Sequence, residues 1–360
     1  MPSASVIAAV RTALPPYRYA QEDLTEAIGD LCLPPGADRA LLRRLHASAG
    51  VRTRHLTLPI ERYATLGDFG RSNDTWLAAG LDLAEEALSG ALKEAGLRPA
   101  DVDLLVCTSV TGVAAPSLDA RLAGRMGLRP DVKRLPLFGL GCVAGAAGLA
   151  RVHDYLRGHP DDTAVLLAVE LCSLTLQRCD DSRANLVAGA LFGDGVAALV
   201  ARGSATGKGG SGPEAPGPSV VATRSHLYPD TERLLGWDIG AGGFRVVIDA
   251  GVPGIVRDHL GRNLRAFLAE QGLTTDDIGT WVCHPGGPRI LSAVTEALAL
   301  PGNALDSARN SLATVGNMSS VSVLHILRTL RDAPRPRPGT WGLLVAMGPG
   351  LCSELVLLRW

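Results

Sequence analysis

The sequence predicts an α/β fold with buried strands, and three observations support this class. Short apolar runs alternate along the chain with longer amphipathic stretches. The short runs are apolar throughout, which is typical of strands covered on both faces. The chain has 360 residues, of which 46% are hydrophobic. A chain of this length favours two packed subdomains over one.

The predicted elements follow one another in order. The first residues, up to Pro16, lack the basic segment and unbroken apolar core of a signal peptide, and they indicate a first strand. Residues 102–110 predict a buried strand, and 118–128 predict the helix after it. Further apolar runs indicate strands at 163–174, 196–202, 280–284, 342–348 and 354–360, with an amphipathic stretch at 289–300.

A run of Gly, Ser and Pro interrupts this pattern at 203–219. Such a composition buries no apolar surface and is typical of an exposed connector. The sequence therefore predicts an N-terminal half at 1–202, a flexible connector at 203–219, and a C-terminal half at 220–360.

The two halves resemble each other at three places in the same order. Val106-Cys107-Thr108 resembles Val282-Cys283-His284, Gly141-Cys142 resembles Gly316-Asn317, and the segment 192–195 resembles 347–350. Each pair has the same strand or helix context. The matches predict a duplicated βα unit, with chance similarity of glycine-rich turns as the alternative.

Composition excludes several classes. With 35 Lys+Arg against 36 Asp+Glu, the chain shows no basic footprint for nucleic acid. No apolar run is long enough to cross a membrane. The 7 cysteines include no C-x-x-C pair, which argues against a disulfide framework or a thiolate metal site. A reducing, cytoplasmic compartment is therefore expected.

Three polar residues occupy matching strand ends and helix starts, so packing the halves face to face would bring them to one cleft. Cys142 precedes a helix of small residues, whose free N–H groups would stabilise a thiolate. His284 follows a buried strand, and a neighbouring imidazole would lower the pKa of the thiol further. Asn317 could join His284 in binding the enolate oxygen left when a malonyl thioester loses carbon dioxide.

Each of these residue types also has an ordinary structural role. A lone Cys is most often a small buried hydrophobe, a lone His is more often structural or exposed, and a Gly-Asn helix start is a common N-cap. The remaining cysteines are expected to be small buried side chains, and the remaining histidines are expected to be structural or exposed. The set of three is the stronger signal, because its members occupy the same kind of position.

Several segments then point to a known family. They are KRLPLFGLGCVAGAAGLARVHDYL, LFGDGVAALV, HPGGPRIL, GNMSSVSVL and GPGLCSELVLL. Together, and over nearly the whole chain, they resemble the type III polyketide synthases, the chalcone synthase-like enzymes. The resemblance implies the five-layered αβαβα thiolase fold with internal duplication, formed as a homodimer.

The resemblance also implies roles for single residues. Cys142 matches the nucleophile that takes an acyl group from coenzyme A and holds the growing chain. His284 matches the partner that keeps this cysteine ionised, and with Asn317 it matches the pair that assists decarboxylation of malonyl-CoA. Phe192 and Phe244 match the two aromatic gatekeepers between the coenzyme A tunnel and the reaction cavity.

The substrates implied are acyl-CoA and malonyl-CoA, with no cofactor, metal or phosphopantetheine attachment. Arg44 matches the basic segment at the tunnel mouth, where cations meet the nucleotide phosphates.

Positions at which this sequence differs from the plant enzymes of the family predict the starter substrate. Ala114 and Ala115, where many relatives carry methionine, look like the bacterial subgroup that accepts long fatty acyl groups, since a smaller wall could open an apolar channel. Thr175 stands where the tetrahydroxynaphthalene-forming subgroup has Cys, which makes that product less expected. Ser319 and Thr175 follow the general pattern. The sequence thus predicts a medium or long acyl-CoA starter and an alkylpyrone or alkylresorcinol product.

Other functions remain open at this level. A 3-oxoacyl-ACP synthase III-like enzyme would share the Cys, His and Asn set but perform a single condensation, and a type III polyketide synthase could use another starter such as malonyl-CoA. A non-catalytic thiolase-fold scaffold and a papain-like hydrolase agree less well with the segments around Cys142.

Overall fold

The computed structural model describes residues 5–204, 217–332 and 335–360. Most of the predicted connector at 203–219 lies outside these residues. The helices are α1 Gln21–Cys32, α2 Ala40–Ala47, α3 Phe69–Ala95, α4 Leu118–Met126, α5 Ala144–Gly158, α6 Arg183–Leu191, α7 Val252–Ile255, α8 Gly261–Glu270, α9 Pro288–Leu298, α10 Asp306–Val315 and α11 Val321–Asp332. The strands are β1 Ser5–Ala13, β2 Tyr17–Ala20, β3 Thr53–Leu56, β4 Leu104–Thr108, β5 Lys133–Leu137, β6 Thr163–Leu171, β7 Asp194–Arg202, β8 Ser219–Leu227, β9 Leu235–Gly240, β10 Gly243–Ile248, β11 Ile278–Cys283, β12 Trp341–Gly348 and β13 Cys352–Arg359.

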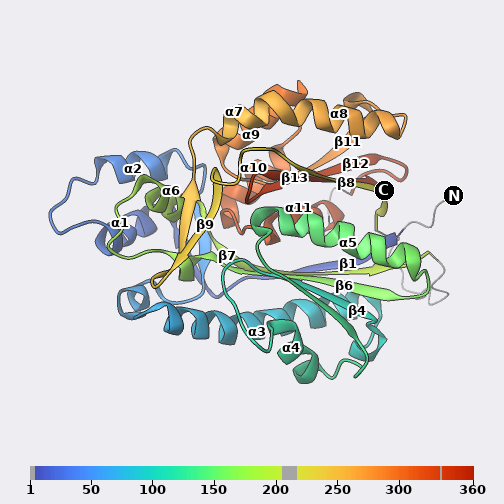
Figure 1. Cartoon of the computed structure of the whole chain (residues 1–360), viewed down its shortest axis with the longest axis horizontal. Coiled ribbons are helices and arrows are strands. Elements are labelled where there is room, and N and C mark those ends of the chain that lie inside the picture. Colours follow the sequence, from blue (N-terminus) through green and yellow to red (C-terminus); the bar gives the residue numbers. More distant parts are fainter. Residues whose placement is uncertain (1–4, 205–216, 333–334) are drawn as a thin grey trace.

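The elements stack in five layers, which confirms the predicted fold class (Figure 1). Helices α8 and α9 cover one outer face, α3 and α4 cover the other, and α5 and α11 lie between two half-sheets. Strands β6, β7, β12 and β13 are almost entirely buried. Their continuous apolar runs follow from this cover on both faces.

The internal repeat is visible in the strand order. The sheet runs β11-β12-β13-β8-β1-β7-β6-β4-β5, so β8, β13, β12 and β11 mirror β1, β7, β6 and β4. The pairing also matches between the halves. Strand β4 pairs parallel with β6, as β11 does with β12, and β6 pairs antiparallel with β7, as β12 does with β13. The half-sheets are joined where β1 pairs with β8, at Ser5 with Val220 and Val6 with Ser219.

Helices α5 and α11 approach each other very closely at one point in the middle layer. A Cβ atom on Gly145 of α5 would lie 2.2 Å from the backbone oxygen of Ser320, just before α11. Real Cβ atoms do not reach such distances, so the contact requires glycine. The small residues of the first helix in the repeat are thus explained by the second helix.

Several elements differ from the sequence prediction at their ends or were missed. The strand predicted at 163–174 ends at Leu171, because a 3-10 turn, Cys172–Thr175, follows it. Strands β2, β3, β5, β9 and β10 are short and largely exposed or mixed in burial, so they carry no continuous apolar run. Within the described ranges, none of the helices combines the length and the apolar character needed to span a membrane.

Candidate active site

A cavity of about 290 Å³ lies where the two halves meet, and Cys142, His284 and Asn317 all line it. His284 follows the last residue of β11 directly. Asn317 lies between α10 and α11. The structure therefore brings together the three residues that the repeat predicts, each from the end of a strand or the start of a helix.

Cys142 lies in a 3-10 turn, Gly141–Val143, that runs into α5. Gly141 has φ +52°, and a Cβ atom there would lie 2.6 Å from Cγ of Pro349. Glycine is therefore needed for the turn to approach the β12–β13 loop. The turn sets the Cys142 thiol at the positive end of α5, partly exposed to the cavity.

Burial is the main influence on the pKa values of Cys142 and His284. It raises the pKa of Cys142 to about 12, although the nearby Ser319 hydroxyl lowers it. Burial also lowers the pKa of His284 to about 4, and His284 Nδ1 has no hydrogen-bond partner among the described residues. Loss of hydration is the largest cause of both shifts, and it favours the uncharged form of each group. The thiolate expected from the helix N-terminus and a neighbouring imidazole stays a prediction.

Asn317 is held by its backbone and by its own side chain. Its N–H donates to the Leu191 carbonyl at 2.8 Å, and its carbonyl accepts from the Gly193 N–H at 3.0 Å. Its Oδ1 accepts from the Ser319 N–H at 2.9 Å. This bond leaves the side-chain NH2 group as the donor that Asn317 can offer to a ligand.

A buried carboxyl group beside this site was missed by the sequence analysis. Glu170 on β6 is fully buried and accepts hydrogen bonds from the Val110 N–H at 3.2 Å, Thr111 Oγ1 at 3.1 Å and Ser320 Oγ at 2.5 Å. Burial raises its pKa to about 7. The signal was present, because Glu170 is the only charged residue in the run TAVLLAVEL.

The predicted gatekeepers lie in different places. Phe192 lines the main cavity and two smaller ones of about 50 and 30 Å³. Phe244 is 3% exposed and packs against Phe69, Phe138 and Trp237, with ring centroids 5.2 to 6.0 Å apart. It lines a separate cavity of about 240 Å³. Phe192 is thus at the nucleophile, while Phe244 is one cavity away.

The remaining predicted pocket residues divide into two groups. Thr175 lines the 50 Å³ cavity behind Phe192, and Ser319 lines the 30 Å³ cavity beside Cys142. Ala114 and Ala115 line none of the cavities described here, since Ala114 packs at the edge of the core and Ala115 is exposed. Within this chain the two alanines do not line the main cavity, although Val110 and Thr111 of the same loop line the 30 Å³ cavity beside Cys142.

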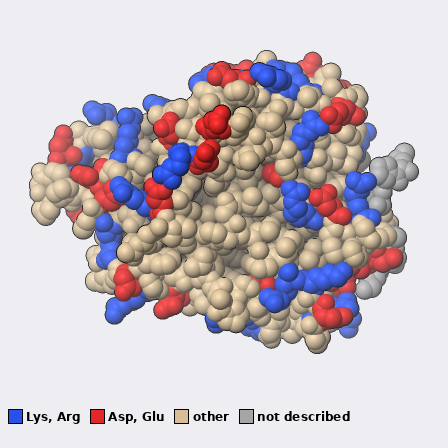
Figure 2. Space-filling model, viewed as in Figure 1, with Lys and Arg blue, Asp and Glu red and all other residues tan. Residues whose placement is uncertain are grey.

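Two arginines line the cavity, and a third lies on a helix beside it, at what we call the cavity mouth. Arg183 and Arg289, in the first turns of α6 and α9, line the cavity. Arg44 is exposed on α2 and does not line the cavity itself, but its neighbour Leu45 and the C-cap residue Ser48 do. Across the described ranges, none of the three arginines pairs with a carboxylate. Figure 2 shows charges of both signs around a broad uncharged centre on the face that it displays.

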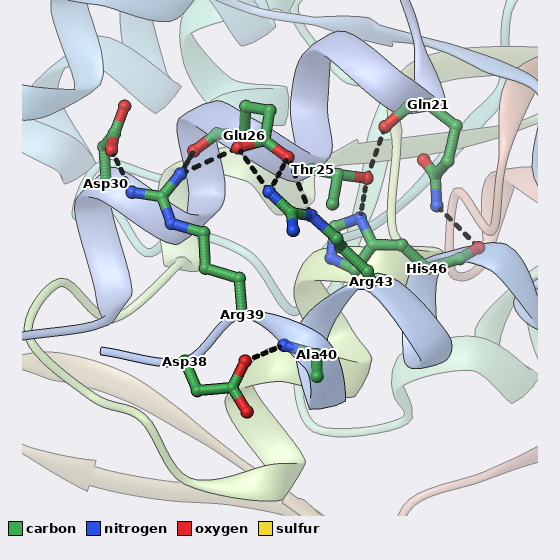
Figure 3. Close-up of polar contacts among 9 residues, drawn as sticks. All are labelled: Gln21, Thr25, Glu26, Asp30, Asp38, Arg39, Ala40, Arg43 and His46. Carbon is green, nitrogen blue, oxygen red and sulfur yellow. Dashed lines mark hydrogen bonds and ion pairs between the residues drawn. The ribbon is translucent and has the colours of Figure 1, made fainter. Parts of the chain in front are cut away.

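Helix α2 is fixed to α1 by its other charges, as Figure 3 shows. Arg39 pairs with Glu26 and Asp30, and Arg43 pairs with Glu26. Thr25 Oγ1 also meets Nδ1 of His46 at 2.8 Å. Because its neighbours Arg39 and Arg43 are neutralised, Arg44 is the unpaired cation that α2 presents near the mouth.

Comparison with known proteins identifies similar sequences and a similar solved structure. The family models for chalcone and stilbene synthases match the chain, the N-terminal domain at residues 3–205 and the C-terminal domain at 219–360. The 1,3,6,8-tetrahydroxynaphthalene synthase of Streptomyces peucetius subsp. caesius is 72% identical over 98% of this chain and 93% of that protein. A putative chalcone synthase of Bacillus subtilis strain 168 is 31% identical, over 98% of each. The crystal structure of the 1,3,6,8-tetrahydroxynaphthalene synthase from Streptomyces coelicolor A3(2), a bacterial type III polyketide synthase, is similar with a TM-score of 0.91 at 31% identity, over 99% of each chain.

Proposed function

The chain belongs to the chalcone and stilbene synthase family and is a type III polyketide synthase, and on this premise we propose that malonyl-CoA serves it both as starter and as extender, with 1,3,6,8-tetrahydroxynaphthalene as the product. The choice of product rests on the 72% identity, over 98% of the chain, to a protein named 1,3,6,8-tetrahydroxynaphthalene synthase. The cavity with Cys142, His284 and Asn317 carries the chemistry.

This proposal replaces the fatty acyl starter that the sequence analysis favoured. A naphthalene with oxygen on alternate carbons is assembled from two-carbon units alone and carries no alkyl tail. The argument for a long starter rested on Ala114 and Ala115, and neither lines the cavity. The argument against tetrahydroxynaphthalene rested on Thr175, a single position, and the identity over almost the whole chain outweighs it.

Acyl transfer begins from the neutral pair. As Sγ of Cys142 attacks the thioester carbonyl, the thiol proton passes to His284, which is an unprotonated base at neutral pH. The carbonyl re-forms as the bond to the coenzyme A sulfur breaks, and the departing thiolate takes the proton. The acyl group is then held as a thioester on Cys142.

Decarboxylation supplies the carbon nucleophile. When malonyl-CoA loses carbon dioxide, the electron pair of the broken C–C bond moves toward the thioester oxygen. The Asn317 side-chain NH2 and a His284 N–H would donate to this enolate oxygen in a largely buried site, where such donors are strong. The enolate carbon then attacks the acyl carbonyl, and the C–S bond to Cys142 breaks.

Ring closure would take place beside Glu170. This carboxyl group, with a pKa of about 7, can both accept and donate a proton near neutral pH. Glu170 does not line the 30 Å³ cavity beside Cys142 itself, but its hydrogen-bond partners Val110 and Thr111 do. Its hydrogen bonds from Thr111 and Ser320 hold it in place.

The starter is tested by competition. The purified enzyme is incubated with radiolabelled malonyl-CoA, alone and with lauroyl-CoA, and the products are identified by mass spectrometry. We expect tetrahydroxynaphthalene from malonyl-CoA alone and little change when lauroyl-CoA is added. Alkylpyrones or alkylresorcinols as the main products would overturn the malonyl starter. A product of one condensation only would instead indicate the 3-oxoacyl-ACP synthase III-like function.

The arginines at the cavity mouth are proposed to bind the phosphates of coenzyme A. Replacing Arg289 or Arg44 by glutamine should raise KM for malonyl-CoA several-fold at nearly unchanged kcat, because an exposed charge-assisted contact contributes about 1 kcal/mol. Steady-state kinetics at low and high salt measure the effect, which should shrink as salt increases. Arg62→Gln is the control, since Arg62 is exposed and neither it nor its neighbours in the chain line the main cavity. Equal KM values for all variants would contradict the assignment.

The homodimer implied by the family remains a proposal, and the outer edge of the sheet supports it. Strand β5 at this edge is exposed, and so are the side chains of Leu135 and Phe138, at 39% and 48%. An open edge with apolar neighbours is a natural place for a second strand to pair. Light scattering should give the mass of two chains, and the mass of one chain would count against the dimer.

A further inference from the structure

Strand β3 is attached to both loops that carry the residues at the cavity. On one side, the Arg52 N–H donates to the Ala313 carbonyl and Thr53 Oγ1 donates to the Thr314 carbonyl, both at 2.8 Å. These carbonyls end α10, just before Asn317. On the other side, the N–H of Thr57 donates to Asp194 Oδ2 at 2.7 Å. The segment 52–57 therefore spans the two loops.

The two loops are also joined to each other. Phe192 and Asn317 form an isolated parallel bridge, through the Gly193 N–H and the Leu191 carbonyl. Space there is minimal, because a Cβ atom on Gly193 would lie 2.4 Å from the Val315 carbonyl oxygen. A small shift of one loop must therefore move the other.

Arg54 lies at the centre of this arrangement. Its side chain is 2% exposed, and Nη1 donates to the Phe192 carbonyl at 2.6 Å. Cβ atoms on Gly193 and Gly316 would lie 3.2 and 3.5 Å from Cβ of Arg54, so its stem packs against the glycine of each loop. The same side chain thus contacts the Phe192 loop through its charge and the Asn317 loop through its stem.

A fully buried guanidinium is costly, and this one is only partly compensated. Asp194 lies close enough to raise the pKa of Arg54, but burial prevails and lowers it to about 10. Nε and Nη2 have no hydrogen-bond partner among the described residues. Asp194 itself is occupied by Thr57 and by the N–H and hydroxyl of Ser173. A well-packed apolar side chain would stabilise such a site as well or better, which favours a role other than stability.

We propose that Arg54 is a positioning residue of the condensation, which fixes Phe192 and Asn317 relative to each other through the Phe192 carbonyl and the two loop glycines. The inference rests on the proposed function, in which Asn317 binds the enolate and Phe192 borders the acyl group. If the bridge loosens, malonyl-CoA can still lose carbon dioxide, but the enolate no longer meets the acyl carbonyl in line. Its protonation to acetyl-CoA then competes with C–C bond formation.

Arg54→Lys tests this role with the charge retained. Lysine keeps a cation but lacks the planar fork and reaches less far, so the contact with the Phe192 carbonyl is weakened. The matched control is Arg328→Lys. Arg328 is 19% exposed, pairs with buried Glu94 and donates to the Val10 carbonyl at 3.0 Å, and it lines none of the described cavities.

The readout is the ratio of acetyl-CoA to polyketide formed from malonyl-CoA, with kcat, KM and melting temperature beside it. For Arg54→Lys we expect a ratio raised about tenfold or more and a lower kcat at nearly unchanged KM, as a misplacement of about 1 Å would give. Arg328→Lys should lower the melting temperature without moving the ratio. If both variants lose activity only in proportion to stability, Arg54 is merely structural and the proposal is overturned.

Hydrogen exchange gives a measurement that needs no turnover. In Arg54→Lys, the amides of Gly193 and Asn317 should exchange faster than in the wild type and in Arg328→Lys, since these amides form the bridge. Unchanged exchange would refute the proposal even if the proposed product were wrong, so the two can fail separately. Should Arg54→Lys not fold, Arg54→Met keeps the stem against the two glycines and removes the bond to the Phe192 carbonyl, and a wild-type ratio and wild-type exchange in that variant would equally refute it.

Discussion

Cys142→Ala is expected to abolish the acyl-enzyme and to lower polyketide formation by at least about 10³-fold, the scale of loss when a nucleophile is removed. The physical reason is that no other cysteine in the described ranges lines the main cavity. Decarboxylation of malonyl-CoA should persist, because His284 and Asn317 remain in place to bind the enolate. Intact-protein mass spectrometry after mixing with malonyl-CoA measures the acyl adduct, and labelled carbon dioxide measures decarboxylation.

Cys179→Ala is the control for this experiment. Cys179 is exposed and lines none of the described cavities, so its removal should leave the adduct and the product unchanged. An adduct of undiminished yield on Cys142→Ala, or continued condensation, would remove Cys142 from the proposed role. Loss of decarboxylation together with condensation would show that the thiol takes part in both steps.

His284→Gln is expected to produce the second largest effect. Glutamine retains an N–H donor for the enolate but cannot take the thiol proton, so acylation should fall by about 10²- to 10⁴-fold while decarboxylation falls less. The rate of adduct formation under single-turnover conditions separates the two steps. Equal losses in both steps would mean that His284 does not act as the base.

The pH dependence tests the same group in the wild type. Burial lowers the pKa of His284 to about 4, so the imidazole remains an unprotonated base as the pH falls, until about 4. The acylation rate should therefore be level through the weakly acidic range and decline only toward pH 4, as shown by rapid pH-jump measurements. A decline centred near the ordinary imidazole value of about 6.5 would indicate a hydrated or ion-paired histidine instead.

The sequence alone was sufficient to predict the site residues that occupy matching positions in the two halves. Cys142 and Asn317 could be predicted because both follow a glycine at the start of a matching helix, and the strand order confirms that these helices are equivalent. His284 could be predicted because it follows an apolar strand directly. Such predictions need only local pattern and the symmetry of the two halves.

The features that were missed depend on contacts between distant segments. The loss of hydration that raises the pKa of Cys142 cannot be read from the local helix, because Met347, Leu351 and other residues that line its cavity come from distant segments. The environment of Arg54 arises only when β3 meets two loops far away in sequence. Ala114 and Ala115 match pocket positions by alignment, but an alignment does not show which way their loop faces.

The close approach of the two central helices limits how this enzyme could be redesigned. Gly145 lines none of the described cavities, yet any larger residue there would push against Ser320, whose hydroxyl holds Glu170 and whose neighbour is Ser319. Substitution would therefore disturb the cavity from behind. A mutant library aimed at new products should vary the cavity lining and leave position 145 untouched, and halves exchanged between relatives should be chosen to keep this pair of residues together.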